Sequence, residues 1–228
     1  NKGVKMRKLT IAIIMLFSSL SLASAEMGVN IGISADVGTF STSGSENENG
    51  EVSKKKDAES LVGYGSVFIE KTLGFLPGPF GRLSVGYSHV PHDLKSGTAD
   101  REDSDMKTGT AGAPVNQKIQ ADFSNFNTLY ATLRITDWLY VKAGSIDVDV
   151  TTNEKLGTGS AYGNTSLDGS TIGAGIHIAS DNGLFFRFEV NDQNFDGVTL
   201  TSTTNSANKV TITDLDGTTA KVAIGKSF

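Results

Sequence analysis

Apolar and polar residues alternate along most of this chain with a period of two. In the last stretch, Val222, Ile224 and Phe228 fall on one parity. Lys221 and Ala223 fall on the other. A two-residue period is typical of β-strands whose two faces meet different surroundings. The pattern therefore predicts an all-β protein.

Eight segments carry this alternation, and each is bounded by polar or turn-forming residues. We expect strands at about residues 29–37, 61–73, 80–91, 118–135, 138–150, 171–178, 184–200 and 209–228. The turn before the seventh strand ends in Asn182-Gly183, which is a strong hairpin signal. Asp216-Gly217 leaves the strand count open, because this pair could form a hairpin turn or a kink in one long strand.

The connections alternate in length along the chain. Brief turns follow the second, fourth and sixth strands, whereas long polar loops follow the others, at about residues 41–60, 92–117, 151–168 and 201–208. Short turns at one end and long loops at the other are typical of an antiparallel up-and-down meander of the transmembrane barrel type. The prediction is thus an eight-stranded antiparallel up-and-down transmembrane β-barrel.

Alternation alone does not say which parity faces inward, since a soluble ligand-binding barrel would turn its apolar side chains to the centre. The lumen of an eight-stranded barrel is only just wide enough to be filled by side chains, and the apolar parity is too bulky for it. The opposite parity is rich in Gly and Ser and carries charges of both signs, which could pair across a lumen. The residues expected in this interior charge network are Glu70, Arg82, Arg134, Asp147, Arg187, Glu189 and Lys221.

The apolar parity would then face lipid. The longest unbroken apolar run of the mature chain, residues 138–141, is too short for a spanning helix, so a chain that enters a bilayer has to close into a barrel. Lys71, Lys142 and Lys226 fall on the same parity near the turn end, where long stems can reach headgroups. The residues expected on the lipid face or in its aromatic girdles are Val85, Tyr87, Trp138, Tyr140, Ile176, Phe186, Phe188, Val222, Ile224 and Phe228.

Residues 1–25 are expected to be an upstream extension followed by a cleavable signal peptide. Arg7 and Lys8 precede the apolar stretch 9–17, and Ala23-Ser24-Ala25 makes a small-x-small cleavage site. Removing this segment with its four basic residues would change the formal net charge from −5 to −9. Such an acidic chain is a poor ligand for nucleic acid.

Candidate chemistry is sparse. The three histidines, His89, His92 and His177, show no metal-ligand spacing, and the Asp147-x-Asp149 pair lacks the liganding pattern of an EF-hand loop. His177 falls on the polar parity, where it could join the charge network or, as a weaker alternative, act as a general base. We therefore expect no catalytic residues, no metal and no cofactor.

The final strand, with apolar residues at alternate positions before a terminal Phe228, resembles the closing strand of bacterial outer-membrane β-barrels; Lys226 departs from the pattern. As a pattern of strands and turns, residues 26–228 resemble the small barrels that include the transmembrane domain of OmpA, OmpX and the opacity porin-like proteins. The resemblance implies the outer membrane of a Gram-negative bacterium, contact with outer-membrane lipid, and recognition of the last strand by the barrel-assembly machinery.

This resemblance is architectural, so it transfers no functional residue, and the partner of the loops stays unknown. Members of the family serve as structural proteins, as surface-exposed adhesins or as narrow pores. We expect a non-enzymatic, porin-like structural protein with surface-exposed loops. The alternatives are a narrow channel for small solutes, a lipid-modifying enzyme of the outer membrane, and a secreted soluble barrel that binds an apolar ligand.

Overall fold

The computed structural model describes residues 28–48, 50–52, 56–97, 99–103, 115–155 and 161–228, so the expected signal peptide lies outside the described residues. The elements are β1 (Val29–Glu48), β2 (Glu51–Val52), β3 (Lys56–Thr72), η1 (Gly78–Arg82), β4 (Leu83–His89), β5 (Leu94–Lys95), β6 (Ala99–Asp103), β7 (Val115–Arg134), β8 (Leu139–Lys155), β9 (Thr165–Ala179), β10 (Leu184–Phe195), β11 (Val198–Thr201) and β12 (Lys209–Ser227). The described part of the chain contains no helix long and apolar enough to cross a bilayer.

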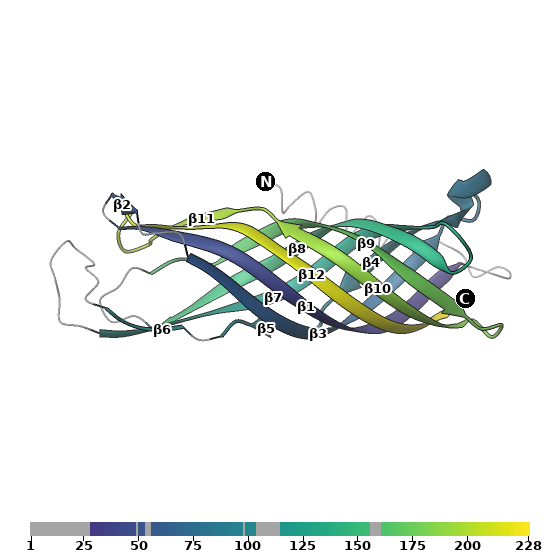
Figure 1. The fold of residues 1–228 in the computed structure, drawn as a ribbon, viewed down its shortest axis with the longest axis horizontal. Coiled ribbons are helices and arrows are strands. Elements are labelled where there is room, and N and C mark those ends of the chain that lie inside the picture. The colour runs from purple at the N-terminus through teal and green to yellow at the C-terminus, as the bar shows by residue number, and fades with distance from the viewer. Residues whose placement is uncertain (1–27, 49, 53–55, 98, 104–114, 156–160) are drawn as a thin grey trace.

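Eight long strands form one antiparallel ring, as Figure 1 shows. Each pairs with its neighbour in the order β1, β3, β4, β7, β8, β9, β10, β12, and β12 pairs back onto β1 from Asn30↔Ser227 to Asn47↔Lys209. The short strands β5 and β6 add to β7, and β11 adds to β12. At the level of β4 each strand of the ring is paired on both sides, which is the condition for crossing a bilayer with strands. Farther along, residues 56–66 of β3 have no partner strand on the β4 side among the described residues.

The strand count that the sequence left open is settled by β12, which runs past Asp216-Gly217 as one strand. Asp214 has a positive φ of 52°, and the register with β1 shifts between Ser41 and Ser43. One extra residue on one strand of an antiparallel pair is a β-bulge. The pair is therefore part of a bent strand and not of a hairpin.

Several strands extend beyond their predicted ends. β1 continues to Glu48 and β3 begins at Lys56, so most of the expected loop 41–60 is paired strand. The expected loop 151–168 is shortened in the same way by β8 and β9, and the expected loop 92–117 contains β5, β6 and the start of β7. Backbone pairing continues in these segments although their side chains lack an apolar face, so the periodic signal is lost before the strand ends.

One predicted strand begins later than expected, and another is divided in two. Residues 80–82 belong to η1 rather than to the third strand, which begins at Leu83. The seventh strand is interrupted at Asp196-Gly197, which separates β10 from β11.

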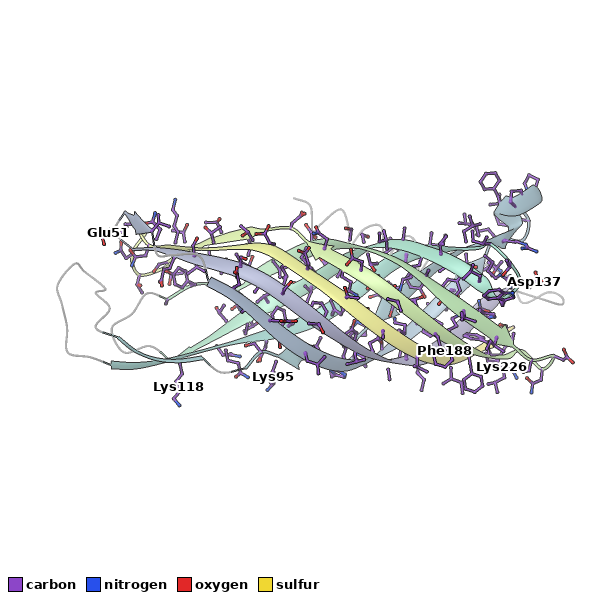
Figure 2. The ribbon with its side chains drawn as sticks, viewed as in Figure 1. Glu51, Lys95, Lys118, Asp137, Phe188 and Lys226 are labelled. Carbon is purple, nitrogen blue, oxygen red and sulfur yellow. The ribbon has the colours of Figure 1, made fainter. Side chains whose placement is uncertain are left out.

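The outer surface carries an apolar belt near the end of the barrel that holds the short turns. Ile33, Ile172 and Val190 expose 59%, 62% and 58% of their surface to the outside. Along β1 the outward residues are apolar up to Val37 and then become Thr and Ser from Thr39 onward. Figure 2 shows Phe188 and Lys226 projecting from the outside of the barrel at this end. We call this surface the lipid belt.

The strands are longer than a membrane requires. A transmembrane strand needs about 9–11 residues, whereas β1 and β7 have 20 each. The strand segments beyond the lipid belt, which we call the outer section, have a polar exterior. Inside it lies a cluster of buried apolar residues, the apolar plug. It consists of Tyr64, Val90, Phe126, Ile146, Val148, Val150, Leu167 and Phe195.

Candidate functional site

Between the apolar plug and the end with the short turns, the lumen is organised around one ion pair. β3 turns Glu70 inward and β10 turns Arg187 inward, where Nη1 and Nη2 donate to the two carboxylate oxygens at 2.5 and 2.6 Å. Asn30 Nδ2 and the Tyr130 hydroxyl donate to the same carboxylate at 3.2 and 3.0 Å. Glu70 is 1% exposed. The buried charge is thus held by four hydrogen bonds, as a charge in such a site must be.

Arg187 also determines which ring nitrogen of a neutral His177 carries the proton. Its Nε–H donates to Nδ1 of His177 at 2.9 Å, so that nitrogen accepts and a neutral ring carries its proton on Nε2. The guanidinium carbon lies 4.7 Å from the ring centroid of Phe185 and 5.5 Å from that of Phe68. Aromatic faces therefore complete the surroundings of the cation.

Two further ion pairs lie in the lumen. Lys142 Nζ lies 2.8 Å from Glu189, which also accepts a hydrogen bond from the Tyr140 hydroxyl at 2.7 Å. Lys221 Nζ lies 3.3 Å from Asp36. Three buried acids thus face three buried bases. We call these three pairs with their hydrogen-bonding neighbours the lumen network.

The sequence-predicted charges divide between lumen and surface. Glu70, Arg187, Glu189 and Lys221 lie in the lumen network, and Arg134 lines the cavity below it. Arg82 was expected inside and is not: it ends η1, outside the ring, and pairs with exposed Asp137 at 3.0 Å. The proline-containing turn delays the start of β4 until the next residue, so Arg82 never enters the lumen.

The facing predicted for β8 was wrong along the whole strand. Tyr140, expected in the aromatic girdle, is 2% exposed and lies in the lumen, and Lys142 is buried beside it. Asp147, expected inside, alternates with the buried residues Ile146 and Val148 and points outward. The upper part of β8 lies in the outer section, where water surrounds the barrel, so its apolar residues turn inward.

The expected interior charge network lacked five members of the lumen network: Lys142, Tyr140, Asp36, Asn30 and Tyr130. One feature of the sequence could have placed Lys142 and Tyr140 in the lumen. Leu139, Val141 and Ala143 form an alternative apolar face at the turn end of β8, and choosing it would have turned Tyr140 and Lys142 inward.

The other expected lipid-facing residues lie on the outside. The well-exposed ones are Trp138, Ile176, Phe186, Phe188, Val222, Ile224 and Phe228. Val85 and Tyr87 alternate with the buried residues of β4 and are half-buried, and the Tyr87 hydroxyl donates to Asn127 at 2.6 Å. Trp138 lies in the turn before β8, and Lys226 Nζ lies 5.8 Å from the Phe228 ring centroid.

The remaining candidate residues, His89, His92 and Asp149, form hydrogen bonds with neighbouring residues. His89 Nδ1 lies 2.8 Å from the Asn127 side chain, and His92 Nε2 accepts the Gly65 N–H at 3.3 Å. Asp149 accepts a hydrogen bond from Asn125 at 2.8 Å. Among the described residues, no three His, Asp or Glu side chains gather as metal ligands.

Successive layers fill the lumen from the short-turn end upward. A cavity of about 810 Å³ opens at that end, and Arg187 and Tyr140 contribute to its lining. Between the lumen network, which contributes Asp36, Lys142 and Lys221, and the apolar plug lies a cavity of about 10 Å³, at the lower limit for holding one water molecule. The apolar plug follows, and Val90 and Phe126 of this plug line the small cavity. Charged and then apolar side chains of the described residues thus occupy the lumen beyond the first cavity.

Comparison with known proteins gives likeness of fold only. No protein-family model matches the sequence, and no curated protein matches it. Three of the similar solved structures are the outer membrane protein OprG from Pseudomonas aeruginosa, the outer membrane protease OmpT from Escherichia coli, and Ail, the attachment invasion locus protein of Yersinia pestis. OprG is 13% identical with a TM-score of 0.49, and the match covers 90% of this chain and 98% of OprG.

The other two likenesses are weaker. OmpT is 9% identical with a TM-score of 0.45, covering 91% of this chain and 99% of OmpT. Ail is 12% identical with a TM-score of 0.34, covering 86% and 99%. Such values transfer no activity, so membership of the barrel class rests on the coordinates themselves. A closed ring of eight strands with an apolar belt on its outside is an integral outer-membrane β-barrel.

Proposed function

We propose that this chain is a non-enzymatic surface protein of the Gram-negative outer membrane that does not conduct solutes. The lipid belt anchors it, the lumen network and the apolar plug make it rigid, and the outer section meets partners outside the cell. In outer-membrane barrels the short turns face the periplasm and the long loops face outward. The outer section would then rise above the membrane surface.

The observation that carries this proposal is the closure of the lumen by two layers of different chemistry. Glu70 and Arg187 fill the lower layer through two short hydrogen bonds, and Ile146 and Val148 help to fill the upper one. A solute would have to separate a buried ion pair, which is costly, and then displace close-packed apolar side chains. These two layers support a lumen that does not conduct.

The chemistry of the outer section suggests what kind of partner it would meet. Acidic residues on its outward face include Asp57, Glu59, Asp147, Asp149, Asp168 and Asp192. Such a surface repels acidic macromolecules and favours cationic or neutral polar ones. Figure 2 shows Glu51, Lys95 and Lys118 at the same end of the barrel, so its rim carries both signs of charge.

Insertion would depend on the closing strand. β12 pairs along most of its length with β1 on one side and with β10 on the other, and its Val222 and Ile224 face outward. We propose the barrel-assembly machinery as the partner that recognises this strand, with outer-membrane lipid as the partner of the mature belt.

Conductance in planar bilayers tests the closed lumen. We expect no steady unit steps from the wild-type protein. Steady steps that Arg187→Ala changes, and that Arg82→Ala leaves unchanged, would show that the protein is a narrow channel. Arg82 is the matched control because its ion pair with Asp137 lies outside the lumen at the same end of the barrel.

Two further measurements test the remaining alternatives. We expect the mass spectrum of lipid A to stay unchanged when the protein is expressed, whereas an altered acyl pattern would show an enzyme. We also expect the protein to stay in the membrane fraction after osmotic shock. Release without detergent would show a soluble barrel.

A further inference from the structure

The connection between β3 and β4 carries an apolar surface that lies outside the ring of strands. Residues 74–81 read Gly-Phe-Leu-Pro-Gly-Pro-Phe-Gly and include no polar side chain. Phe75 and Phe80 are 79% and 62% exposed, and η1 buries none of its residues. Figure 1 shows η1, the blue coil, projecting sideways from the ring at the end with the short turns. We call residues 74–81 the apolar turn.

The turn between β7 and β8 adds apolar residues on the same side of the barrel. Arg82 Nη2 lies 3.0 Å from Asp137 Oδ1, and Arg82 Nη1 donates to the Ile135 carbonyl at 3.4 Å, so Arg82 ties the two turns together. Ile135 and Trp138 are both exposed. The third short turn, residues 180–183, reads Ser-Asp-Asn-Gly and is polar. The exposed apolar residues of the short turns therefore gather on the side of β4 and β7.

This surface continues the lipid belt. Leu83, the first residue of β4, pairs with Leu133 of β7, which pairs with Val141 of β8. All three side chains alternate with buried residues and lie on the outer face. Phe80 follows three residues beyond this row, and Arg82 stands between them with a partly exposed guanidinium, as a charge at headgroup level does. Because lipid covers the belt, it is also the partner that reaches the adjoining surface.

The backbone of the apolar turn sets the depth at which it fits. In hydrocarbon every N–H and C=O needs a partner within the protein, which a turn cannot supply as a helix or closed sheet does. Pro77 and Pro79 have no N–H to satisfy, and the Leu76 N–H donates to the Leu73 carbonyl at 2.9 Å. The remaining groups need water or headgroups. Exposed aromatic side chains on a partly hydrated backbone match the membrane–water interface.

We infer that the apolar turn, together with Ile135 and Trp138, binds phospholipid of the leaflet on the periplasmic side, at the level of the glycerol and headgroups. The acyl chains begin at that level and meet the aromatic rings, while the headgroup region hydrates the turn. Because the turn at residues 180–183 is polar, this contact is one-sided and would fix the depth and tilt of the barrel. It adds a lipid contact outside the ring and does not depend on the proposed surface role.

Depth-dependent quenching of tryptophan tests this inference. The full chain is folded into phosphatidylcholine vesicles whose acyl chains carry bromine either near the glycerol or near the methyl end. Trp138 is the only tryptophan, so the wild type reports on the turn after β7. In a Trp138→Phe background, Phe80→Trp reports on the apolar turn, and Asp181→Trp is the control in the polar turn at the same end. Phe80 is chosen because Phe75 also lines the cavity of about 810 Å³.

We expect both probes to be quenched more by bromine near the glycerol than by bromine near the methyl end, and the control to be quenched little by either. Phe80→Trp quenched no more than Asp181→Trp would place the apolar turn in water and overturn the inference. Stronger quenching of Phe80→Trp by the deep bromine would place it in hydrocarbon, which also overturns it. Quenching that falls as the protein-to-lipid ratio rises would mean that a second copy, and not lipid, covers the surface.

Two checks keep the result interpretable. Heat-dependent mobility in gels shows whether each variant is folded, and if Phe80→Trp does not fold, Trp138 of the wild type decides the outcome. Ile176→Trp in the lipid belt is the positive reference. Strong quenching of this reference with an unquenched Phe80→Trp would overturn the lipid contact of the apolar turn while leaving the barrel and its proposed role intact.

Discussion

Glu70 and Arg187 meet in a space that aromatic rings enclose, with the carboxylate satisfied by Asn30 and Tyr130 as well. At the scale of single residues, this pair shows how a narrow barrel can hold a charge by surrounding it with hydrogen-bond donors and aromatic faces. A buried pair is seldom better than apolar residues of the same volume, but breaking it leaves an uncompensated charge. Its contribution should therefore appear most clearly when only one partner is removed.

Glu70→Ala should lower the free energy of unfolding by about 3–5 kcal/mol, because Arg187 would stay buried without a counter-charge. Urea unfolding of the barrel in lipid vesicles measures this. Arg82→Ala breaks an exposed pair and should cost less than about 1 kcal/mol. Equal losses from the two variants would contradict the buried network.

Gly86→Ala should destabilise the barrel by about 1–3 kcal/mol, the usual cost of overpacking. A Cβ at this position would lie 2.5 Å from Tyr130 Cζ and 2.8 Å from Glu70 Cγ, both inside the lumen. The same unfolding measurement applies, with Val85→Ala as the control on the lipid side of the same strand. Val85→Ala leaves the lumen unchanged, so a loss for Gly86→Ala no greater than for this control would show that the lumen is looser than described.

At the scale of elements, β8 shows what an alternation does and does not determine. Its period correctly predicts a strand, yet the same inward parity carries Tyr140 and Lys142 near the turns and Ile146 and Val148 farther along. The geometry of the strand does not change, but its surroundings do. Lipid outside favours a polar interior, and water outside favours an apolar one.

β8 offers a direct test, because the chain has no native cysteine. Asp149→Cys should react with a membrane-impermeant maleimide on intact cells, since this residue faces outward in the outer section. Val148→Cys should stay unlabelled until the protein is denatured, since Val148 is 3% exposed. Labelling of Val148→Cys in preference to Asp149→Cys would mean that the strand faces the other way.

The bulges are the other element-scale feature that the sequence hides. Asn125 has a φ of 51°, and the register with β8 shifts between Ser124 and Asn127. Phe126 lies in the apolar plug, and on the other side of the bulge Phe123 packs against it. The irregularity thus lets residues of opposite parity reach the same interior, which no strict period of two could predict.

At the scale of the whole molecule, the barrel combines two arrangements in one ring. Near the turns it is apolar outside and polar inside, and in the outer section it is the reverse. The sequence was sufficient to predict the ring, with its count of eight left open only at Asp216-Gly217. It also predicted the facing of β9, β10 and β12, because these strands carry apolar residues mainly within the belt. It was insufficient in the outer section of β1 and β3, since the Ser and Thr residues of β1 and the charged residues at the start of β3 give no apolar period.

The pairing of charges within the lumen could not be predicted. Arg134 belonged to the expected charge network, but Glu70 pairs with Arg187 instead and Arg82 pairs with Asp137 outside the ring. Pairing partners across a lumen are set by the register of several strands together. A single sequence shows which charges face inward and not which of them meet.

The measurement that tests the account most directly is the quenching of single tryptophans by brominated lipid acyl chains. With Trp138→Phe as background, Ile176→Trp places the probe in the lipid belt and Asn194→Trp places it outward on β10 in the outer section. We predict strong quenching of the tryptophan at position 176 and almost none of the tryptophan at position 194. Weak quenching at 176, or equal quenching at both, would contradict it.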